Sequence, residues 1–384
     1  MRVLVISHAA VIPENQAPYC EMERLEGMEV ALIVPRVWRA SVGGPKAFVR
    51  HERLQAEVVE RNVRFNGHIN LHYYPGLSLP ALPFLPDVVY ADEDAHSLAA
   101  YQALRLAQTV RAAFVFKSNQ NTARIYPPPF RWMEGAVLRG ADGAIAIAPA
   151  CAEVLRAKEF RAAIDVIGHG VDPEVFQPRD EAERRGKLGL EGFVVGYMGR
   201  LSVEKGVDTL IWGFHRLVDH CMGEPPAMLL IVGDGPERAR LEALARRLLA
   251  PECVVFAGAV PHGEAARYLS CMDVLVLPSR TTRSWKEQFG RVIIEAMACG
   301  VPVIGSDSGN IPELVKETGG GVVFPEANWR ELAVELGKLA RNPEAARELG
   351  RTGRAAVLER YTYPALARRI AAALRHAVTR HDAG

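Results

Sequence analysis

Twelve short apolar runs, separated by stretches of helical periodicity, constrain the fold of this chain more than any other feature. Apolar strands without alternation, joined by helices, predict parallel sheets that are covered on both faces. A single sheet of twelve strands would be unusually large, so we expect an α/β protein with two doubly wound, Rossmann-like domains. The runs are RVLVIS, EVALIVP, DVVYA, AAFVF, GAIAIA and AIDVIG in the first half, and FVVGYMG, AMLLIVG, CVVFAG, DVLVLP, VPVIGS and GGVVF in the second.

The segment GHGVDPEVFQPRDEAERRG, residues 168–186, is rich in glycine, proline and charge, and it predicts the boundary between the two domains. We expect an N-terminal domain over residues 1–168 and a C-terminal domain over residues 172–360. The last segment, YTYPALARRIAAALRHAV, predicts a helix within residues 361–384 with Pro364 in its first turn.

Composition excludes several classes of protein. The formal net charge of the 384 residues is +1, without the basic excess of a nucleic-acid-binding protein. The six cysteines, which include Cys221, form no C-x-x-C pair; this argues against a zinc site or disulfide scaffold and suits a reducing cytosol. The N-terminus predicts a strand rather than a signal peptide, and no apolar run approaches the ~18 residues of a membrane span. We expect a cytoplasmic protein that rests at most on a membrane surface.

Three loops of the second half follow predicted strands and open helices, which is where open α/β sheets bind ligands. In GYMGRLSVEKGVDTLIWGF, Gly199 permits close approach of the backbone to a ligand, and Arg200 and Lys205 add two cations. A helix N-terminus flanked by cations favours a diphosphate. The alternative is a solvated turn with two surface cations.

The second loop, IVGDGPERARLEAL, has Gly233 and Gly235 but lacks the third glycine of G-x-G-x-x-G, so it is a weak signal. The third loop, WKEQFGRVIIEAMACGVPV, contains Glu287 and Glu295. If a helix begins near Gly290, Glu287 lies in the loop before it and Glu295 about a turn further in. Taken alone, the pair could be two exposed glutamates at a helix end.

These stretches together resemble family 4 glycosyltransferases, which are retaining, metal-independent enzymes of the GT-B fold. The motifs GHGVDPEVFQP, GRLSVEKGVDTLI, IVGDGPERARLEAL, DVLVLPS and EQFGRVIIEAMACGVPVIGSDSGNIPELV have the order and spacing of that family. The resemblance is strong over about residues 165–325 and weaker before them. Its most specific element is the E-x7-E signature from Glu287 to Glu295.

The resemblance implies roles for the donor site. Glu287 would contact the donor sugar, Glu295 the ribose, and Arg200 and Lys205 the diphosphate; a carboxylate suits the two sugar roles because it accepts hydrogen bonds from hydroxyls. We assign Arg200, Lys205 and Glu287 to catalysis. The other residues of the predicted donor site are Gly199, Gly206, Gly233, Val260, Pro261, Phe289, Gly290, Arg291, Val292 and Glu295.

The implied activity is transfer of a hexose, with retention, from a UDP-, GDP- or ADP-sugar to a hydroxyl of a glycan, glycolipid or small molecule. The resemblance implies no cofactor and no metal. It also implies that the first domain binds the acceptor and that the C-terminal helix crosses back to it.

A glycosidase would place both carboxylates beside the scissile bond. A nicotinamide-dependent dehydrogenase would need the missing glycine motif, and a non-catalytic nucleotide-sugar sensor would bind without turnover.

The first half departs from the family pattern. Its first loop, SHAAVIPENQAPYC, offers His8 and Asn15 but no glycine pair, and the loop after AAFVF offers Lys117 and its polar neighbours in place of a histidine. In PDVVYADEDAHSL, Asp92-x-Asp94 matches a metal-binding D-x-D, but we interpret these acids as helix caps. A role for Glu93 facing the acceptor stays open.

Two segments of the first half mix cations with aromatic residues. They are VPRVWRASVGGPKAFVR and NTARIYPPPFRWMEG, which contain Trp38 and Trp132 respectively. Such surfaces can rest on anionic lipid, which would suit a lipid-linked acceptor. The alternative is packed aromatic side chains beside solvated arginines.

Overall fold

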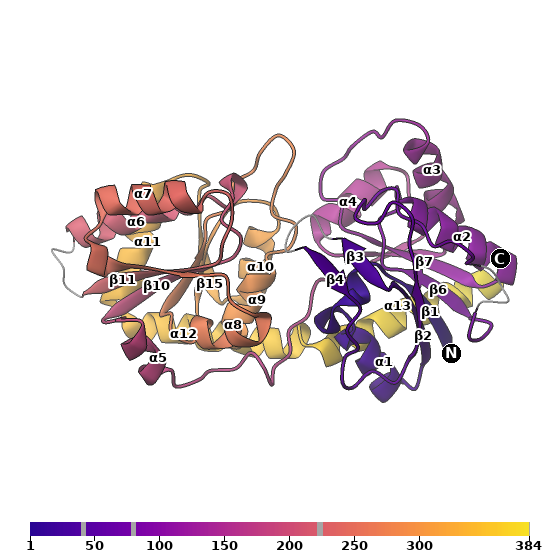
Figure 1. Cartoon of the computed structure of the whole chain (residues 1–384), viewed down its shortest axis with the longest axis horizontal. Helices are drawn as coiled ribbons and strands as arrows, with labels where there is room; N and C mark the ends of the chain where they lie inside the picture. Colours follow the sequence, from indigo (N-terminus) through magenta and orange to yellow (C-terminus); the bar gives the residue numbers. More distant parts are fainter. Residues whose placement is uncertain (40–43, 78–81, 221–225, 384) are drawn as a thin grey trace. The chain divides into compact units, whose positions relative to one another are not determined.

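The chain folds into two compact units, each with its own parallel sheet (Figure 1). The computed structural model describes residues 1–39, 44–77, 82–220 and 226–383; Cys221 lies outside these ranges. One unit consists of residues 1–168 and 363–384, and the other of residues 169–362. The expectation of two doubly wound α/β domains is confirmed.

The sheet of the first unit has the strand order β5-β2-β1-β6-β7-β8-β9, with all neighbours parallel. Its strands are β1 (Arg2–Ile6), β2 (Glu29–Pro35), β5 (Glu57–Arg61), β6 (Val88–Ala91), β7 (Ala113–Ser118), β8 (Gly143–Ala146) and β9 (Ala163–Val166).

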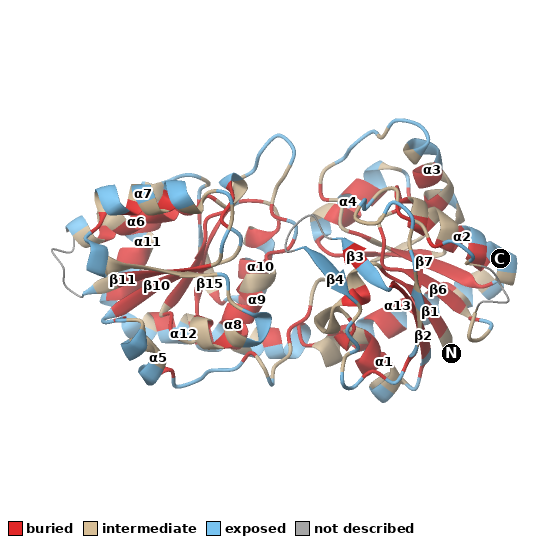
Figure 2. Ribbon diagram, in the orientation of Figure 1, coloured by how far each residue is buried: buried red, intermediate tan, exposed pale blue. Residues whose placement is uncertain are grey.

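Helices cover both faces of this sheet, because successive strand residues point to opposite faces and both sets are apolar. In β1, Val3 and Val5 pack into a core with α1 and α13, whereas Leu4 and Ile6 pack into a core with α2, α3 and α4. Figure 2 shows the strands buried between these layers. The helices are α1 (Ala17–Glu26), α2 (Leu98–Val110), α3 (Phe130–Gly140), α4 (Pro149–Ala157) and α13 (Tyr363–Ala383).

The sequence predicts six strands in the first half, but the sheet there has seven. The additional strand, β5, is an edge strand with the sequence EVVER and is only partly buried, so it lacks the continuous apolar run of the others. A separate antiparallel pair, β3 (Val37–Arg39) and β4 (Pro45–Ala47), was also not predicted. The prediction that acids cap α2 is wrong: Ser97 is the N-cap, and its hydroxyl accepts a hydrogen bond from the backbone N–H of Ala100.

The second unit has a six-stranded parallel sheet with the order β12-β11-β10-β13-β14-β15. Its strands are β10 (Phe193–Met198), β11 (Ala227–Val232), β12 (Val254–Gly258), β13 (Val274–Leu277), β14 (Val303–Ser306) and β15 (Gly321–Phe324). Its helices are α5 (Ala182–Lys187), α6 (Val207–His220), α7 (Arg238–Leu248), α8 (His262–Leu269), α9 (Arg291–Ala298), α10 (Ile311–Thr318), α11 (Trp329–Arg341) and α12 (Pro343–Arg360).

In each sheet, successive strands are added first toward one edge and then, from one internal point, toward the other edge. In the first unit this point lies between β1 and β6, and in the second between β10 and β13. Loops that leave the carboxyl ends of such neighbouring strands diverge, and the crevice between them is the usual ligand site of open α/β sheets. None of the helices in the described residues has the length and hydropathy that crossing a bilayer requires.

Candidate donor site of the second unit

The loops after β10 and β13 bring Lys205 and Glu287 together at the switch point of the second sheet. Lys205 ends a short 3-10 turn, Val203–Lys205, just before α6. Its Nζ lies 2.6 Å from Oε2 of Glu287, although the two residues are 82 positions apart. The side chain of Lys205 is 21% exposed and that of Glu287 is 9% exposed, so this ion pair is shielded but can be reached by a ligand.

Further contacts hold the two side chains in place. The hydroxyl of Ser279, which follows β13, donates a hydrogen bond to Oε2 of Glu287 at 2.9 Å. The ammonium of Lys205 lies 4.7 Å from the centre of the Trp285 ring. On the backbone, the N–H of Asn310 donates to the carbonyl of Glu287 at 3.1 Å. The carboxylate is therefore pre-oriented by side-chain and main-chain contacts alike.

Helix α9 begins directly after this loop, at a glycine. Gly290 is its N-cap residue, with φ of 83°, and no side chain among the described residues caps the first turn. The N–H groups of a first helical turn lack intrahelical partners and carry partial positive charge. The start of α9 can therefore bind an anion such as a phosphate.

Glu295 lies within α9 and is buried, with 7% of its surface exposed. Burial raises the pKa of Glu295, and this is only partly opposed by the charges of His262 and Arg291. The described residues offer its carboxylate no hydrogen bond. A buried acceptor without a donor is costly, and a hydroxyl-bearing ligand would satisfy it.

The structure places the other predicted residues around the same edge of the sheet. Gly199 follows β10 and Gly233 follows β11; a Cβ on Gly233 would lie 1.9 Å from the carbonyl oxygen of Gly199, so the two loops touch. Arg200 is exposed. Val260 and Pro261 follow β12 at the far edge of the sheet, two strands from β10, and no hydrogen bond joins their backbone to the Lys205–Glu287 pair in the described residues.

Two of the predicted residues have side chains with packing roles. Phe289 is buried, with its ring 5.2 Å from that of His169. Nη2 of Arg291 lies 3.1 Å from Nδ1 of the same histidine. His169 thus links the linker segment to the first turn of α9. Sequence analysis did not single out His169, Ser279 or Trp285, although all three stand within quoted motifs.

Gly206 shapes the turn that carries Lys205, and we predict that Gly206→Ala destabilises the protein. Its φ is +63°, and a Cβ there would lie 2.1 Å from the carbonyl oxygen of Pro278. Left-handed strain alone costs about 1–2 kcal/mol, and the contact adds to it. A lower melting temperature in thermal unfolding is expected. Gly186→Ala is the control, since its Cβ would meet nothing within 4 Å; equal melting of the two variants would contradict the prediction.

The second unit is similar in sequence to known glycosyltransferases. Residues 178–356 match the family model described as glycosyl transferases group 1. A D-inositol 3-phosphate glycosyltransferase of Segniliparus rotundus is 33% identical over 196 residues, which are 50% of this chain and 42% of that protein. A GDP-mannose-dependent alpha-(1-6)-phosphatidylinositol monomannoside mannosyltransferase of Mycolicibacterium smegmatis is 33% identical over 215 residues, 55% of this chain and 56% of that protein. The matches thus span about half the length of these curated relatives.

Solved structures resemble the whole chain. HepE from Anabaena, in complex with UDP, has a TM-score of 0.72 at 20% identity and covers 98% of this chain and 100% of its own. A sucrose-phosphate synthase from Thermosynechococcus elongatus has a TM-score of 0.69 at 22% identity, over 98% of both chains.

The chain therefore has the two-domain GT-B fold of glycosyltransferases, as the sequence predicts. Residues 178–356, which lie in the second unit, match the glycosyl transferases group 1, and this match and the curated relatives support the resemblance to a glycosyltransferase of the GT-B fold.

Proposed function

We propose that the protein transfers a hexose from a nucleoside-diphosphate sugar to a hydroxyl of a glycan, glycolipid or small-molecule acceptor. The observation that carries this proposal is the arrangement around α9. The Lys205–Glu287 pair lies beside the helix start, and within the described part of the chain no side chain caps that start and none gives the carboxylate of Glu295 a hydrogen bond. The relative that is named for GDP-mannose and the neighbour that was solved with UDP support a nucleotide-sugar donor.

In this mechanism the diphosphate binds at the start of α9, and Glu295 accepts hydrogen bonds from the ribose. The acceptor oxygen attacks the anomeric carbon while the bond from that carbon to the phosphate oxygen breaks, and the electron pair goes to the phosphate. Arg200, Lys205 and the helix dipole stabilise the charge that develops there. Glu287 holds the sugar hydroxyls, and the departing phosphate oxygen takes the acceptor's proton, so that transfer proceeds with retention and without a metal.

A thermal-shift screen tests the donor proposal. UDP, GDP and ADP and their hexose derivatives are added in the presence of EDTA, since a ligand that binds only the folded state raises the melting temperature. We expect one nucleotide series to stabilise the protein, with a product whose anomeric configuration equals that of the donor by NMR. Stabilisation by NADH alone would favour the dehydrogenase. Donor binding without turnover with any hydroxyl acceptor would favour the sensor.

We propose cytoplasmic action at a membrane surface. The five cysteines of the described residues are free thiols, which suits a reducing compartment. Of the two aromatic segments, the first has a buried Trp38, as in the packed alternative, but the second exposes Ile125 (89%) and Trp132 (69%). Arg124, which precedes Ile125 in the second segment, is exposed as well.

Ile125→Ser should weaken binding to anionic vesicles about 10- to 100-fold, because burying one isoleucine side chain is worth about 1.5–3 kcal/mol. Sedimentation with phosphatidylserine vesicles at low salt measures the effect. Ile69→Ser is the matched control, since Ile69 is also an exposed isoleucine of the first unit (53%). Failure of the unaltered protein to sediment would contradict the membrane proposal.

A further inference from the structure

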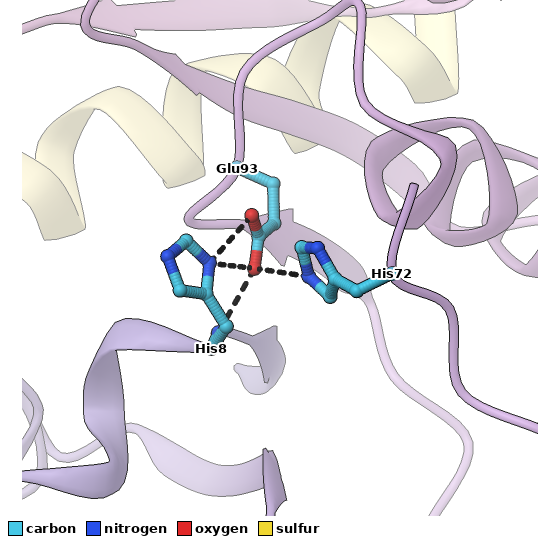
Figure 3. A group of neighbouring side chains, drawn as sticks. All are labelled: His8, His72 and Glu93. Carbon is cyan, nitrogen blue, oxygen red and sulfur yellow. Dashed lines mark hydrogen bonds and ion pairs between the residues drawn. The ribbon is translucent and has the colours of Figure 1, made fainter. Parts of the chain in front are cut away.

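Three side chains of the first unit, His8, His72 and Glu93, lie close enough together to suggest a metal site (Figure 3). Nδ1 of His8 lies 2.7 and 2.8 Å from the two oxygens of Glu93, and Nε2 of His72 lies 3.3 Å from one of them. Two ligands of a tetrahedral zinc ion are roughly 3.3–3.5 Å apart, so the shorter distances are those of hydrogen bonds. The side chains of Glu93 and His72 are fully buried. The group is therefore a hydrogen-bonded network, and Glu93 does not face an acceptor.

A hollow of about 600 Å³ lies at the opposite edge of the same sheet. It is lined by α3, by the segment between α4 and β9, and by the end of α13. Ala141 and Ala162, which line it, stand just before β8 and β9, and these two strands are parallel. The hollow is therefore at the amino ends of the strands, whereas open α/β sheets usually bind their ligands at the carboxyl ends. All its lining residues belong to the first unit.

Three arginines from different elements line this hollow. Arg139 lies in the last turn of α3, Arg161 in the segment before β9, and Arg380 in the last turn of α13. All three are exposed. In the part of the chain that the structure describes, no carboxylate forms an ion pair with any of them. Like charges around one hollow repel one another, so an anion bound among them would lower the electrostatic energy.

The other charged residues of the lining do not neutralise the arginines. Lys158 pairs with Glu134 at 2.5 Å, so these two charges offset each other. Glu159 is the one carboxylate of the described lining. Gly135 leaves room for Arg139, since Nη1 of Arg139 lies 3.1 Å from where a Cβ on this glycine would be. The guanidinium group therefore lies against α3, at the wall of the hollow.

The competing interpretation is that these cations only stabilise helix ends. A cation in the last turn of a helix interacts favourably with the helix dipole, and Arg139 and Arg380 stand in such turns. Arg161 does not, because it follows the end of α4 by four positions and belongs to no helix or strand. The helix dipole therefore does not account for all three arginines at one hollow.

We propose that this hollow binds a phosphate-bearing anion through the guanidinium groups of Arg139, Arg161 and Arg380. A guanidinium group keeps its charge at physiological pH, and its planar fork donates paired hydrogen bonds to phosphate oxygens. The volume lies within the range of small-molecule sites, about 300–1,000 Å³. The inference goes beyond the proposed function and does not rest on it.

The phosphate has two possible sources, a free anion and a lipid headgroup. The enclosed volume suits a free anion such as a diphosphate. A lipid headgroup is suggested by Trp132, which is 69% exposed and shares a face of α3 with Gly135 and Arg139, since these positions are three and four residues apart. The chemistry that the arginines recognise is the same in both cases.

The first experiment measures binding of inorganic pyrophosphate by isothermal titration at low salt. The full chain carries Lys205→Ala, which weakens the proposed diphosphate site of the second unit. Adding Arg161→Gln and Arg380→Gln should reduce the affinity about 10- to 100-fold, the loss of charge-assisted hydrogen bonds. Arg368→Gln, an exposed arginine of α13, replaces these two changes in the control and should leave the affinity unchanged.

The second experiment distinguishes the two sources. Phosphatidylcholine vesicles with and without phosphatidic acid are sedimented with the unaltered chain and with Arg161→Gln/Arg380→Gln. A loss of pyrophosphate binding alone would assign the hollow to a free anion. A loss of sedimentation with the phosphatidic acid vesicles, with or without the other loss, would assign it to a lipid headgroup. If the arginine changes altered neither kind of binding, the inference would be overturned.

Melting temperatures separate the proposal from a purely structural role. Variants that melt earlier but bind pyrophosphate and vesicles as the unaltered chain does would show that the arginines only stabilise helix ends. If Arg161→Gln/Arg380→Gln fails to fold, Arg161→Gln alone decides the question, because Arg161 ends no helix. The thermal shift produced by a nucleotide-sugar donor should be the same in all these arginine variants, so the proposed function stands or falls separately.

Discussion

Substitution of Lys205 by alanine is expected to lower turnover of a nucleotide-sugar donor about 100- to 1,000-fold, the usual effect of removing one group that stabilises charge in a transition state. Lys205 is shielded and lies beside both Glu287 and the start of α9, so its charge acts in a poorly solvated place. Steady-state kinetics measures the effect. Lys316→Ala, an exposed lysine of α10 in the same unit, should change turnover little.

The effect of Lys205 on stability is separable from its effect on turnover. Removing it leaves the buried carboxylate of Glu287 with the Ser279 hydroxyl as a side-chain donor, which costs about 1–3 kcal/mol. The double variant Lys205→Met/Glu287→Gln removes both charges and should recover much of the melting temperature without recovering turnover. If the single variant kept turnover within threefold of the unaltered protein, Lys205 would have no role in leaving-group stabilisation.

Glu295→Gln is expected to change stability and ligand binding in opposite directions. Burial raises the folded-state pKa of Glu295, so the residue favours the folded state in its protonated form, and that contribution is lost as the pH rises through the raised pKa. Above the ordinary pKa of a glutamate, burial of this carboxyl group therefore destabilises the ligand-free protein. Glutamine, which carries no charge, should raise the melting temperature at pH 7, and the difference between the two proteins should shrink toward pH 4.

The same substitution should weaken nucleotide binding about 10- to 100-fold, since hydrogen bonds to a charged group contribute about 1.5–3 kcal/mol each. Isothermal titration with the nucleotide found in the thermal-shift screen measures this. Glu313→Gln, an exposed glutamate of α10, is the control. A variant that is both less stable and equally able to bind the nucleotide would show that Glu295 has a structural role only.

Much of the second unit was predictable because its ligand loops are continuous in sequence. Helical spacing, with a glycine at the end of the helix, predicted that α9 begins near Gly290. It also predicted that Glu287 lies before the helix and Glu295 inside it. The closeness of Lys205 to Glu287 could be expected only from the resemblance, because 82 positions separate them and spacing alone does not fix a tertiary contact. The hydrogen bond from the Ser279 hydroxyl to Glu287 likewise depends on how the loop after β13 folds.

The first unit was less predictable for physical reasons. The edge strand β5 buries too little surface to show an apolar run. The acids after β6 were interpreted as caps because the sequence does not reveal that Ser97 takes this role, which leaves Glu93 to pair with two histidines. One signal was present: His8 and Glu93 each follow a predicted strand at a similar distance, and a doubly wound order makes those strands neighbours.

A crystal of the full chain soaked with the stabilising donor would test the central claim most directly. We predict diphosphate density at the first turn of α9, within hydrogen-bond distance of Lys205, with the ribose hydroxyls on Glu295 and the sugar hydroxyls on Glu287. Diphosphate density bound elsewhere on the second unit, with the carboxylate of Glu295 still unoccupied, would contradict the assignment.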